Sequence, residues 1–364
     1  MSDFLFVTWD GGGNVPPAAG IATELAARGH TVRFIGHEGN RRQLPGTDFT
    51  AYTRARPFAS VEKNSLLAHI KMFGDRGMGA DVLAELDRRP ADLVVVDCMA
   101  FGVIHAIERA GIRYVLLEHL YDEYFSAKWL KGPIGLGVRA QRLAPQRGLD
   151  AAALRLVASA PELDPAGRRD RPANMVHTGP VVTGTPANPS EPTILVSLST
   201  YNFPGQAAAL QRVIDAVAGL DARVVVTTGP AIDGSALRPS SNTEIHDWVR
   251  HGELMPEVSL VVGHGGHATT MSALAHDIPL LILPMHPMLD QPMVGRSIAE
   301  AGAGRMAKKT APSGQLRPLI EELLDDGPHR SAAAALGAAI RGARGAATAA
   351  DRLEAVVRDE VPQS

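Results

Sequence analysis

The sequence is poor in cysteine, has no excess of one charge and lacks a long apolar run. Its 364 residues include one cysteine, Cys98, which excludes an internal disulfide framework and any metal site built from several cysteines. The 36 Lys and Arg residues against 39 Asp and Glu residues give a net charge of −3, which does not favour a nucleic-acid partner. The longest apolar stretches, such as residues 93–96 and 278–285, fall far short of the ~18 residues of a membrane-spanning helix, so no membrane partner is expected.

What is present is typical of a cytoplasmic globular protein with two domains. Apolar residues make up 45% of the chain and charged residues 21%, which is enough for a substantial core. At ~100–200 residues per domain, 364 residues indicate two domains. Residues 1–9 form an apolar run with no basic segment before it, which favours a first strand over a signal peptide.

Strand-like and helix-like segments alternate along both halves of the chain. The strand-like segments are rich in Val, Ile and Leu, which is typical of strands buried on both faces, so we predict parallel sheets with crossover helices. The predicted strands are 4–9, 31–35, 93–96 and 114–117 in the first half, and 193–198, 223–227, 244–247, 260–263 and 280–283 in the second. The predicted helices are 18–28, 102–110, 206–218, 269–276 and 290–301, with two more in the Ala-rich tail 330–358.

A change in composition marks the domain boundary. Residues 178–192 hold two glycines and four prolines and are typical of a linker. We therefore expect a first domain over 1–185, a second over 186–345, and a terminal helix in 346–364 that packs back on the first domain. Ligands of doubly wound sheets bind at the carboxyl ends of the strands, so a cleft between the two domains is the expected site.

A glycine pair follows one predicted strand and introduces a helix. Gly265 and Gly266 allow backbone N–H groups to approach a ligand closely, and a helix N-terminus favours an anion such as phosphate. His264 is placed to donate to that anion, and Thr269 and Thr270 bring hydroxyls to the first helical turn. The alternative is a plain glycine turn with a buried histidine and threonine caps.

Two further segments supply groups that recognise sugars and bases. Asp290 and Gln291 follow another buried strand and together offer acceptors and a donor to sugar hydroxyls, although Asp290 also suits a helix cap. Trp248 offers a stacking surface for a base, and its alternative is an ordinary core tryptophan.

In their order and spacing, these segments resemble the donor half of inverting glycosyltransferases of family 1 with the GT-B fold, especially the actinobacterial enzymes that decorate antibiotics. The similar segments span most of residues 193–305, and the first half matches more loosely at 27–30 and 92–97. The resemblance implies an α/β fold with two Rossmann-like doubly wound parallel-sheet domains facing across a cleft, followed by C-terminal helices. The similar segments are Val196-Ser197-Leu198-Ser199-Thr200, Thr228-Gly229-Pro230, Asp247-Trp248-Val249, His264-Gly265-Gly266-x-x-Thr269-Thr270 and Pro284…Asp290-Gln291.

The same resemblance implies a nucleotide-sugar donor on the second domain and a small-molecule acceptor on the first. Ser199 stands where glycine is commoner in its loop, and the hydroxyl of Thr200 is expected near the donor. The implied donor-binding residues are Trp248 and Val249 at the base, His264, Gly265, Gly266, Thr269 and Thr270 at the diphosphate, and Asp290 and Gln291 at the sugar.

One departure from the family concerns the donor. Members that use UDP-glucose carry a Glu eight positions after the cradle histidine, where its carboxylate binds both ribose hydroxyls; this chain has Ser272. Deoxyribose lacks one of these two hydroxyls, so a Glu beside it would be left partly unpaired. Because the chain has no Glu at this position, we expect a TDP-linked deoxysugar as co-substrate. No other cofactor and no metal are expected, since the chain lacks the Asp-x-Asp sequence that holds a divalent ion in the other major glycosyltransferase fold.

A second departure concerns the catalytic base. The family's base is a His in the first loop, oriented by a distant Asp; here Asn14 takes the place of that His, while Asp97 matches the Asp. An amide does not act as a base at neutral pH. We favour Asp10 as the base, directly or through a water, with Asn14 orienting the acceptor. His119, which follows the strand 114–117, is a further candidate, and a phenol or amine acceptor would need little help from a base.

The expected reaction is a single in-line displacement at the anomeric carbon with inversion. The main rival is a catalytically impaired homologue that binds a sugar nucleotide or activates a partner, and a homodimer is left open. A dehydrogenase is disfavoured because Gly11 and Gly13 are followed by Pro16 where the dinucleotide fingerprint requires a third glycine.

Overall fold

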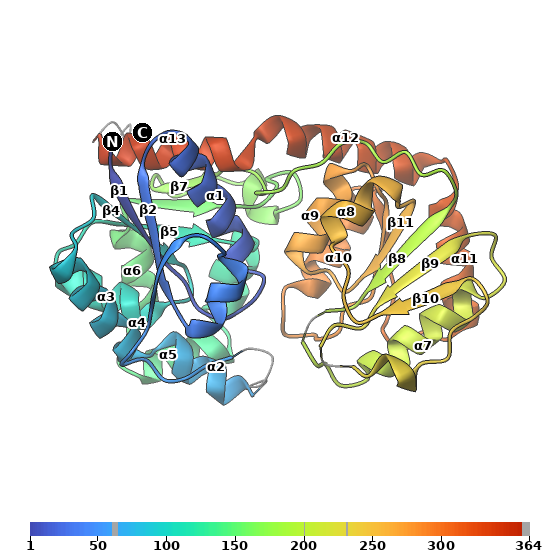
Figure 1. Cartoon of the computed structure of the whole chain (residues 1–364), viewed down its shortest axis with the longest axis horizontal. Coiled ribbons are helices and arrows are strands. Elements are labelled where there is room, and N and C mark those ends of the chain that lie inside the picture. Colours follow the sequence, from blue (N-terminus) through green and yellow to red (C-terminus); the bar gives the residue numbers. More distant parts are fainter. Residues whose placement is uncertain (60–64, 200, 231, 359–364) are drawn as a thin grey trace. The chain divides into compact units, whose positions relative to one another are not determined.

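The computed structural model describes residues 1–59, 65–199, 201–230 and 232–358. The chain divides into two compact units, whose elements are labelled in Figure 1. The first unit comprises residues 1–181 together with the chain from residue 343 onward, and the second comprises residues 182–342. Within the described ranges, no helix has both the length and the apolar character needed to cross a membrane.

The first unit is built on a seven-stranded sheet in the order β3-β2-β1-β4-β5-β6-β7, with every neighbouring pair parallel. The chain moves outward from β1 to one edge and then returns to β4 to build the other, so the β1/β4 pair is the topological switch point. The strands are β1 (Asp3–Val7), β2 (Thr31–Gly36), β3 (Asp48–Ala51), β4 (Leu93–Asp97), β5 (Tyr114–Glu118), β6 (Leu154–Val157) and β7 (Met175–His177).

Helices connect these strands, as the alternating pattern predicts. Helices also occupy much of the described residues 65–89 and 121–148. The helices of the first unit are α1 (Val15–Ala27), η1 (Glu38–Gln43), α2 (Leu66–Phe73), α3 (Arg76–Arg88), α4 (Phe101–Arg109), the π-helix η2 (Glu123–Trp129), α5 (Pro133–Ala140), α6 (Pro145–Ala151), η3 (Pro165–Arg168) and α13 (Gly345–Val357).

The last helix, α13, packs against α1 and completes the core of the first unit. Its Leu353 is fully buried in the same apolar cluster as Ile21 of α1. At the rim of this contact, Arg28 Nη1 donates to Asp351 (2.6 Å) and His30 Nε2 lies 3.0 Å from Glu354 Oε1. A helix more than 300 positions away in the sequence therefore covers part of the first sheet.

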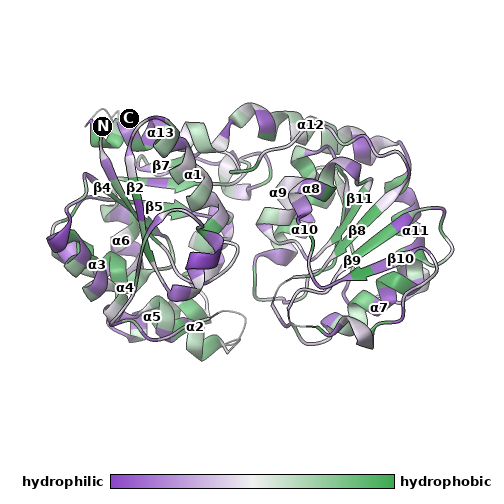
Figure 2. Ribbon diagram, viewed as in Figure 1, coloured by the Kyte–Doolittle hydropathy of each residue, from purple (hydrophilic) through white to green (hydrophobic). Residues whose placement is uncertain are grey.

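The second unit has a six-stranded parallel sheet in the order β10-β9-β8-β11-β12-β13, and its switch point is the β8/β11 pair. Figure 2 shows β8, β9 and β11 as largely hydrophobic, in keeping with their burial on both faces. The strands are β8 (Thr193–Ser197), β9 (Arg223–Thr227), β10 (Thr243–His246), β11 (Leu260–Gly263), β12 (Leu280–Ile282) and β13 (Gly304–Met306). The helices are α7 (Gln206–Val217), η4 (Gly234–Ala236), α8 (His251–Leu254), η5 (Met255–Glu257), α9 (His267–Ala275), α10 (Gln291–Glu300), α11 (Ser313–Leu324) and α12 (Pro328–Ala343).

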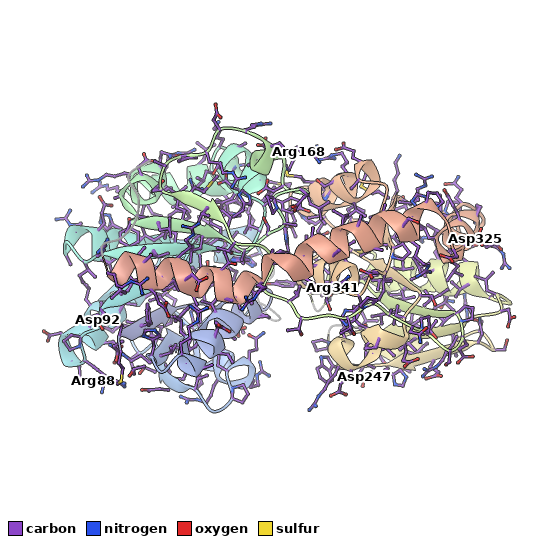
Figure 3. The ribbon with its side chains drawn as sticks, turned by 90° about the horizontal axis from the view of Figure 1, so that it is seen from above. Arg88, Asp92, Arg168, Asp247, Asp325 and Arg341 are labelled. Carbon is purple, nitrogen blue, oxygen red and sulfur yellow. The ribbon has the colours of Figure 1, made fainter. Side chains whose placement is uncertain are left out.

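An ion pair fastens α12 to the end of α9. Arg341, labelled on α12 in Figure 3, donates to Asp277 Oδ1 at 2.6 Å and to the carbonyl oxygen of Ala275 at 2.7 Å. Asp277 itself has a φ of 62°, a left-handed conformation that ends the helix. Arg341 thus satisfies a carbonyl at the C-terminus of α9 and helps to fix that helix on its sheet.

If α13 is part of the first unit's core, Leu353→Ala should lower the free energy of unfolding of that unit by about 2–5 kcal/mol. Hydrogen exchange should then accelerate in α1 and β1, while β8 and β9 stay protected. The matched control is Leu323→Ala on α11, which is equally buried in the second unit. It should accelerate exchange in β8 and β9 and leave α1 and β1 protected. Unchanged exchange in α1 of Leu353→Ala would contradict the assignment of α13 to the core.

Candidate active site

In the second unit, the turn after β11 has the backbone of an anion-binding loop. Gly265 has a φ of +88°, and a Cβ there would lie 3.0 Å from the carbonyl oxygen of Gln291. A Cβ on Gly266 would come within 2.6 Å of His264 Nε2, so conformation favours glycine at 265 and the close imidazole favours it at 266. Gly266 is the N-cap of α9 and has no side chain with which to cap it. The first N–H groups of α9 are therefore left for a ligand.

His264 borders this turn as a neutral group. Burial lowers the pKa of His264 to about 4, and neither the nearby Asp290 carboxylate nor a hydrogen bond with the backbone of Ser197 offsets that effect. At neutral pH the imidazole therefore carries no charge. Its single N–H can be donated to an anion in place of the backbone of Ser197.

The predicted hydroxyls around this turn differ in exposure. Thr270 is buried at 1% exposure, whereas Thr269 is partly exposed, so Thr269 is the hydroxyl that a ligand can reach. Ser199 follows β8 with a φ of 122°, a region that favours glycine, and its Oγ accepts from the backbone N–H of Tyr201 at 3.0 Å. Thr200 lies outside the described residues.

Asp290 and Gln291 lie against the same turn. Gln291 Oε1 accepts from the backbone N–H groups of Met285 (2.8 Å) and His286 (3.1 Å), which holds the loop after β12 and leaves the amide nitrogen for other partners. Asp290 is the N-cap residue of α10 but makes no capping hydrogen bond. Its Oδ2 instead lies 3.0 Å from Nε2 of His267, the first residue of α9.

Sequence reasoning missed two residues of this region, His267 and Lys309. Lys309 Nζ donates to the carbonyl oxygens of Pro204 (2.8 Å) and Met285 (2.7 Å), so it ties the loop after β8 to the loop after β12. The only sequence signal for His267 was its place in the glycine-rich turn. Lys309 had no signal, because its partners are backbone atoms far away in the sequence.

Trp248 and Val249 lie in the segment after β10, at the edge of the sheet. Trp248 is 66% exposed, so the alternative of a core tryptophan is wrong. Val249 is partly exposed. An indole that stays exposed in a folded unit is available for stacking with a planar ligand.

In the first unit, polar side chains meet at the β1/β4 switch point. Asn14 follows β1 and Asp97 ends β4, and both are buried, at 2% and 6% exposure. Asn14 Nδ2 donates to Asp97 Oδ2 (3.0 Å), and also to Thr8 Oγ1 and the carbonyl oxygen of Trp9, both at 3.1 Å. Asn14 is the N-cap residue of α1 but makes no capping bond with its side chain. The amide is therefore used to hold Asp97.

Asp10 is directed elsewhere. Its backbone N–H donates to His37 Nδ1 at 3.4 Å, and a Cβ placed on Gly39 of η1 would clash with its carboxylate. At 8% exposure the side chain is buried against η1. Asn14 thus contacts Asp97 at the end of β4, whereas Asp10 lies beside His37 and Gly39 in the segment after β2.

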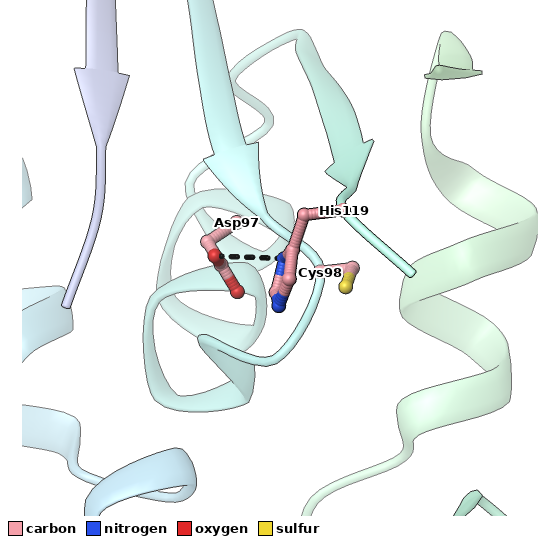
Figure 4. A group of neighbouring side chains, drawn as sticks. All are labelled: Asp97, Cys98 and His119. Carbon is pink, nitrogen blue, oxygen red and sulfur yellow. Dashed lines mark ion pairs between the residues drawn. The ribbon is translucent and has the colours of Figure 1, made fainter. Parts of the chain in front are cut away.

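His119, which follows β5, lies on the other side of Asp97. Its Nδ1 is 3.4 Å from Asp97 Oδ2, the interaction drawn in Figure 4. Cys98 completes a group whose potential ligand atoms lie within 4.8 Å of one another. Burial raises the pKa of the Cys98 thiol well above its usual range, despite a hydrogen bond from the backbone of His119.

Aromatic rings pack beside the first loop. The Trp9 ring lies 5.4 Å from that of Phe73, which lies 5.2 Å from that of Trp129, measured between centroids. Phe58 contacts Trp9 at 5.9 Å. The 60–89 and 121–148 segments thus bring aromatic rings to the residue that precedes Asp10.

The low pKa of His264 should make stability depend on pH. Because the folded pKa, about 4, lies below the ordinary 6.5, the unfolded chain binds this proton first as pH falls. Between pH 6.5 and 5, the wild type should therefore lose about 1–2 kcal/mol relative to His264→Gln. Urea unfolding of both proteins at pH 7.5 and pH 5.0 measures this difference, and parallel losses in the two proteins would contradict the neutral assignment.

Comparisons with solved structures confirm the predicted fold. The chain superposes with a TM-score of 0.81 on the glycosyltransferase of kitacinnamycin, at 20% identity over 97% of this chain and 98% of that one. The TM-score is 0.74 for the glycosyltransferase VinC in complex with dTDP, at 19% identity over 98% of this chain and all of that one. The two Rossmann-like parallel-sheet units are those of the GT-B fold.

Comparisons of sequence give the same relationship. The chain is 24% identical to the 4'-demethylrebeccamycin synthase of Lentzea aerocolonigenes, over 91% of this chain and 94% of the relative. It is 27% identical to the demethyllactenocin mycarosyltransferase of Streptomyces fradiae, over 98% of this chain and 87% of the relative. Residues 211–355 match the family described as erythromycin biosynthesis protein CIII-like, C-terminal domain. The chain is therefore a homologue of the actinobacterial antibiotic glycosyltransferases of GT-B fold, with an EryCIII-like C-terminal domain.

Proposed function

We propose that the chain is an inverting, metal-independent glycosyltransferase that moves a deoxysugar from a TDP-linked donor to a hydroxyl or amine of a small natural product. The observation that carries this proposal is the turn at Gly265 and Gly266, which presents the uncapped N-terminus of α9. The loop with Asp290 and Gln291 is held against that turn. A diphosphate and the sugar attached to it need these two features side by side.

The second unit binds the donor in this proposal. The diphosphate takes hydrogen bonds from the first N–H groups of α9, from His264 and from the Thr269 hydroxyl. The sugar contacts Asp290 and the amide nitrogen of Gln291. Trp248, 66% exposed, stacks on the base with Val249 beside it, and the Ser199–Thr200 loop after β8 borders the donor.

Two considerations support TDP over UDP. Ser272, partly exposed on α9, has no carboxylate to bind a pair of ribose hydroxyls, so it suits a deoxyribose. The homologous fold of VinC was solved with dTDP.

The first unit binds the acceptor. The buried aromatic group around Trp9, Phe73 and Trp129 forms an apolar wall beside the first loop, so an apolar or aromatic aglycone fits best. Asp97 orients the base in this scheme, as the resemblance implies. Asp10 and His119 are the two groups on the first unit that compete for the role of base, and Asn14 does not qualify because it is an amide.

In the reaction, the acceptor oxygen attacks the anomeric carbon as the bond to the diphosphate breaks on the opposite face. The electron pair of that bond goes to the diphosphate, where the N–H groups of α9 and the neutral His264 stabilise the added charge. Because these donors are fixed before the reaction, no metal is needed to neutralise the leaving group. The product is the glycoside with inverted configuration, together with TDP.

Incubation with TDP-sugars and a panel of phenolic and polyketide acceptors tests this function, with TDP release followed by chromatography. We expect TDP release that depends on the acceptor. Trp248→Ala should weaken donor binding by roughly 1–3 kcal/mol, because the stacking surface is removed. The control is Trp129→Phe, in the first unit, which should leave TDP affinity unchanged. Tight TDP binding without release across the panel would favour the rival, a sugar-nucleotide binder without activity.

Nucleotide preference should respond to Ser272. Ser272→Glu places a carboxylate where UDP-using relatives of the family carry one, so UDP affinity should rise relative to TDP by roughly tenfold, about 1.4 kcal/mol. Ser272→Gln, of similar size but without charge, is the matched control and should shift the ratio less. Calorimetric titration with TDP and UDP measures both ratios. A wild type that binds UDP more tightly than TDP would remove the argument from Ser272.

A further inference from the structure

We propose that His119 is the general base of the reaction, that Asp97 orients it, and that Asn14 is a positioning residue for Asp97. This inference rests on the proposed function and names the residue that takes the acceptor's proton. It also explains how an asparagine can stand at the position where the family carries its base. The base has moved to the opposite side of the same carboxylate.

The sheet order makes this exchange possible. β1, β4 and β5 are consecutive neighbours in a parallel sheet, so Asn14, Asp97 and His119 all emerge from the same edge. Asp97 pairs in register with Leu117 of β5, and His119 comes two residues later. Asp97 is thus the central member of the three, with Asn14 on the β1 side and His119 on the β5 side.

The contacts fix the carboxylate from several directions. Asp97 Oδ1 accepts from the backbone N–H of Met99 at 2.9 Å. Asp97 Oδ2 accepts from Asn14 Nδ2 at 3.0 Å and lies 3.4 Å from His119 Nδ1. Asn14 Nδ2 also lies 3.1 Å from both Thr8 Oγ1 and the carbonyl oxygen of Trp9, so its two hydrogens are shared among three acceptors that include Asp97. The His119 imidazole lies near Asp97 Oδ2 on the β5 side.

His119 is held at two points. Its backbone N–H donates to the sulfur of Cys98, and its Nδ1 faces Asp97. Figure 4 shows the imidazole and the Asp97 carboxylate beside each other, with the thiol of Cys98 behind. The His119 side chain is 13% exposed and that of Asp97 is 6% exposed, so the imidazole is the more accessible of the two.

The proton balance follows from this arrangement. In the tautomer that carries its proton on Nδ1, which lies 3.4 Å from Asp97 Oδ2, the neutral imidazole keeps a lone pair on Nε2. Nε2 takes the proton of the acceptor hydroxyl as the acceptor oxygen bonds to the anomeric carbon and the diphosphate leaves with the electron pair of its bond. The imidazolium is stabilised by Asp97 and then returns its proton to solvent.

The geometry favours His119 over Asp10. The Asp10 carboxylate lies beside Gly39 of η1, which follows β2, whereas Asn14, Asp97 and His119 form one connected group. The Asp97 carboxylate stabilises the imidazolium that forms when His119 takes a proton.

The experiment compares wild type, His119→Gln, Asp10→Asn and the control His105→Gln, whose histidine lies on α4. Each is assayed with a TDP-sugar and two phenols, 4-methylphenol and the more acidic 4-nitrophenol, after thermal unfolding has shown that each is folded. We expect His119→Gln to lose about 100-fold to 10,000-fold in kcat with 4-methylphenol, with little change in KM and unchanged TDP affinity. The loss should be smaller with 4-nitrophenol, which needs less help to lose its proton.

Two further readouts separate a base from a structural residue. The acidic limb of the pH profile of kcat should disappear in His119→Gln, and added imidazole should restore activity to His119→Gly but not to Asp97→Asn. Nitrogen NMR of labelled histidine should show His119 protonated at Nδ1 in wild type, and a different tautomer distribution in Asp97→Asn.

The outcomes distinguish this inference from the proposed function. Wild-type turnover with an unaffected His119→Gln, or with a loss confined to Asp10→Asn, overturns the assignment of the base alone. The absence of TDP release by wild type with every acceptor overturns the proposed function and the assignment with it.

Discussion

The candidate site residues of each unit depend on one constraint, the reversal of strand order within that unit's parallel sheet. At β1/β4 and at β8/β11 the connecting helices turn to opposite faces, so the loops at the carboxyl ends of these strands are left open to ligands. In the first unit this brings Asn14 and Asp97 together, and in the second it places Ser199 near the turn of Gly265 and Gly266. The strand order therefore determines where these two groups of loops lie.

In the first unit, a buried carboxylate organises the polar groups around it. Asp97 is bound by an amide, a backbone N–H and an imidazole, which compensate for the cost of keeping the side chain at 6% exposure. An amide in place of a basic side chain next to such a carboxylate cannot take a proton, but it can fix the carboxylate's orientation. An asparagine at position 14 is therefore compatible with the proposed activity, provided that another base contacts Asp97.

The candidate residues of the second unit are easier to locate from the sequence than those of the first unit, because their signals are local. Gly265 and Gly266 adjoin the helix that they introduce, and Asp290 and Gln291 are consecutive, so periodicity and spacing locate them. By contrast, His119 lies 22 positions after Asp97, and only the register of β4 with β5 shows that the two meet. The short strands β3, β6, β7 and β13 were missed for a similar reason, since three or four residues carry little periodic signal without their partners.

In the second unit, the polar groups around the Gly265 and Gly266 turn are either uncharged or already paired. His264 is uncharged at neutral pH, the ammonium group of Lys309 is directed to two carbonyl oxygens, and Asp290 is paired with His267. In the proposed function, the affinity for a diphosphate therefore rests mainly on the oriented N–H groups and the dipole of α9, which act over the first turn of the helix and are already in place. Such donors gain most when negative charge increases at a fixed position, as it does on a departing diphosphate. An enzyme built in this way stabilises the leaving group more than the intact donor, which is the difference that accelerates a reaction.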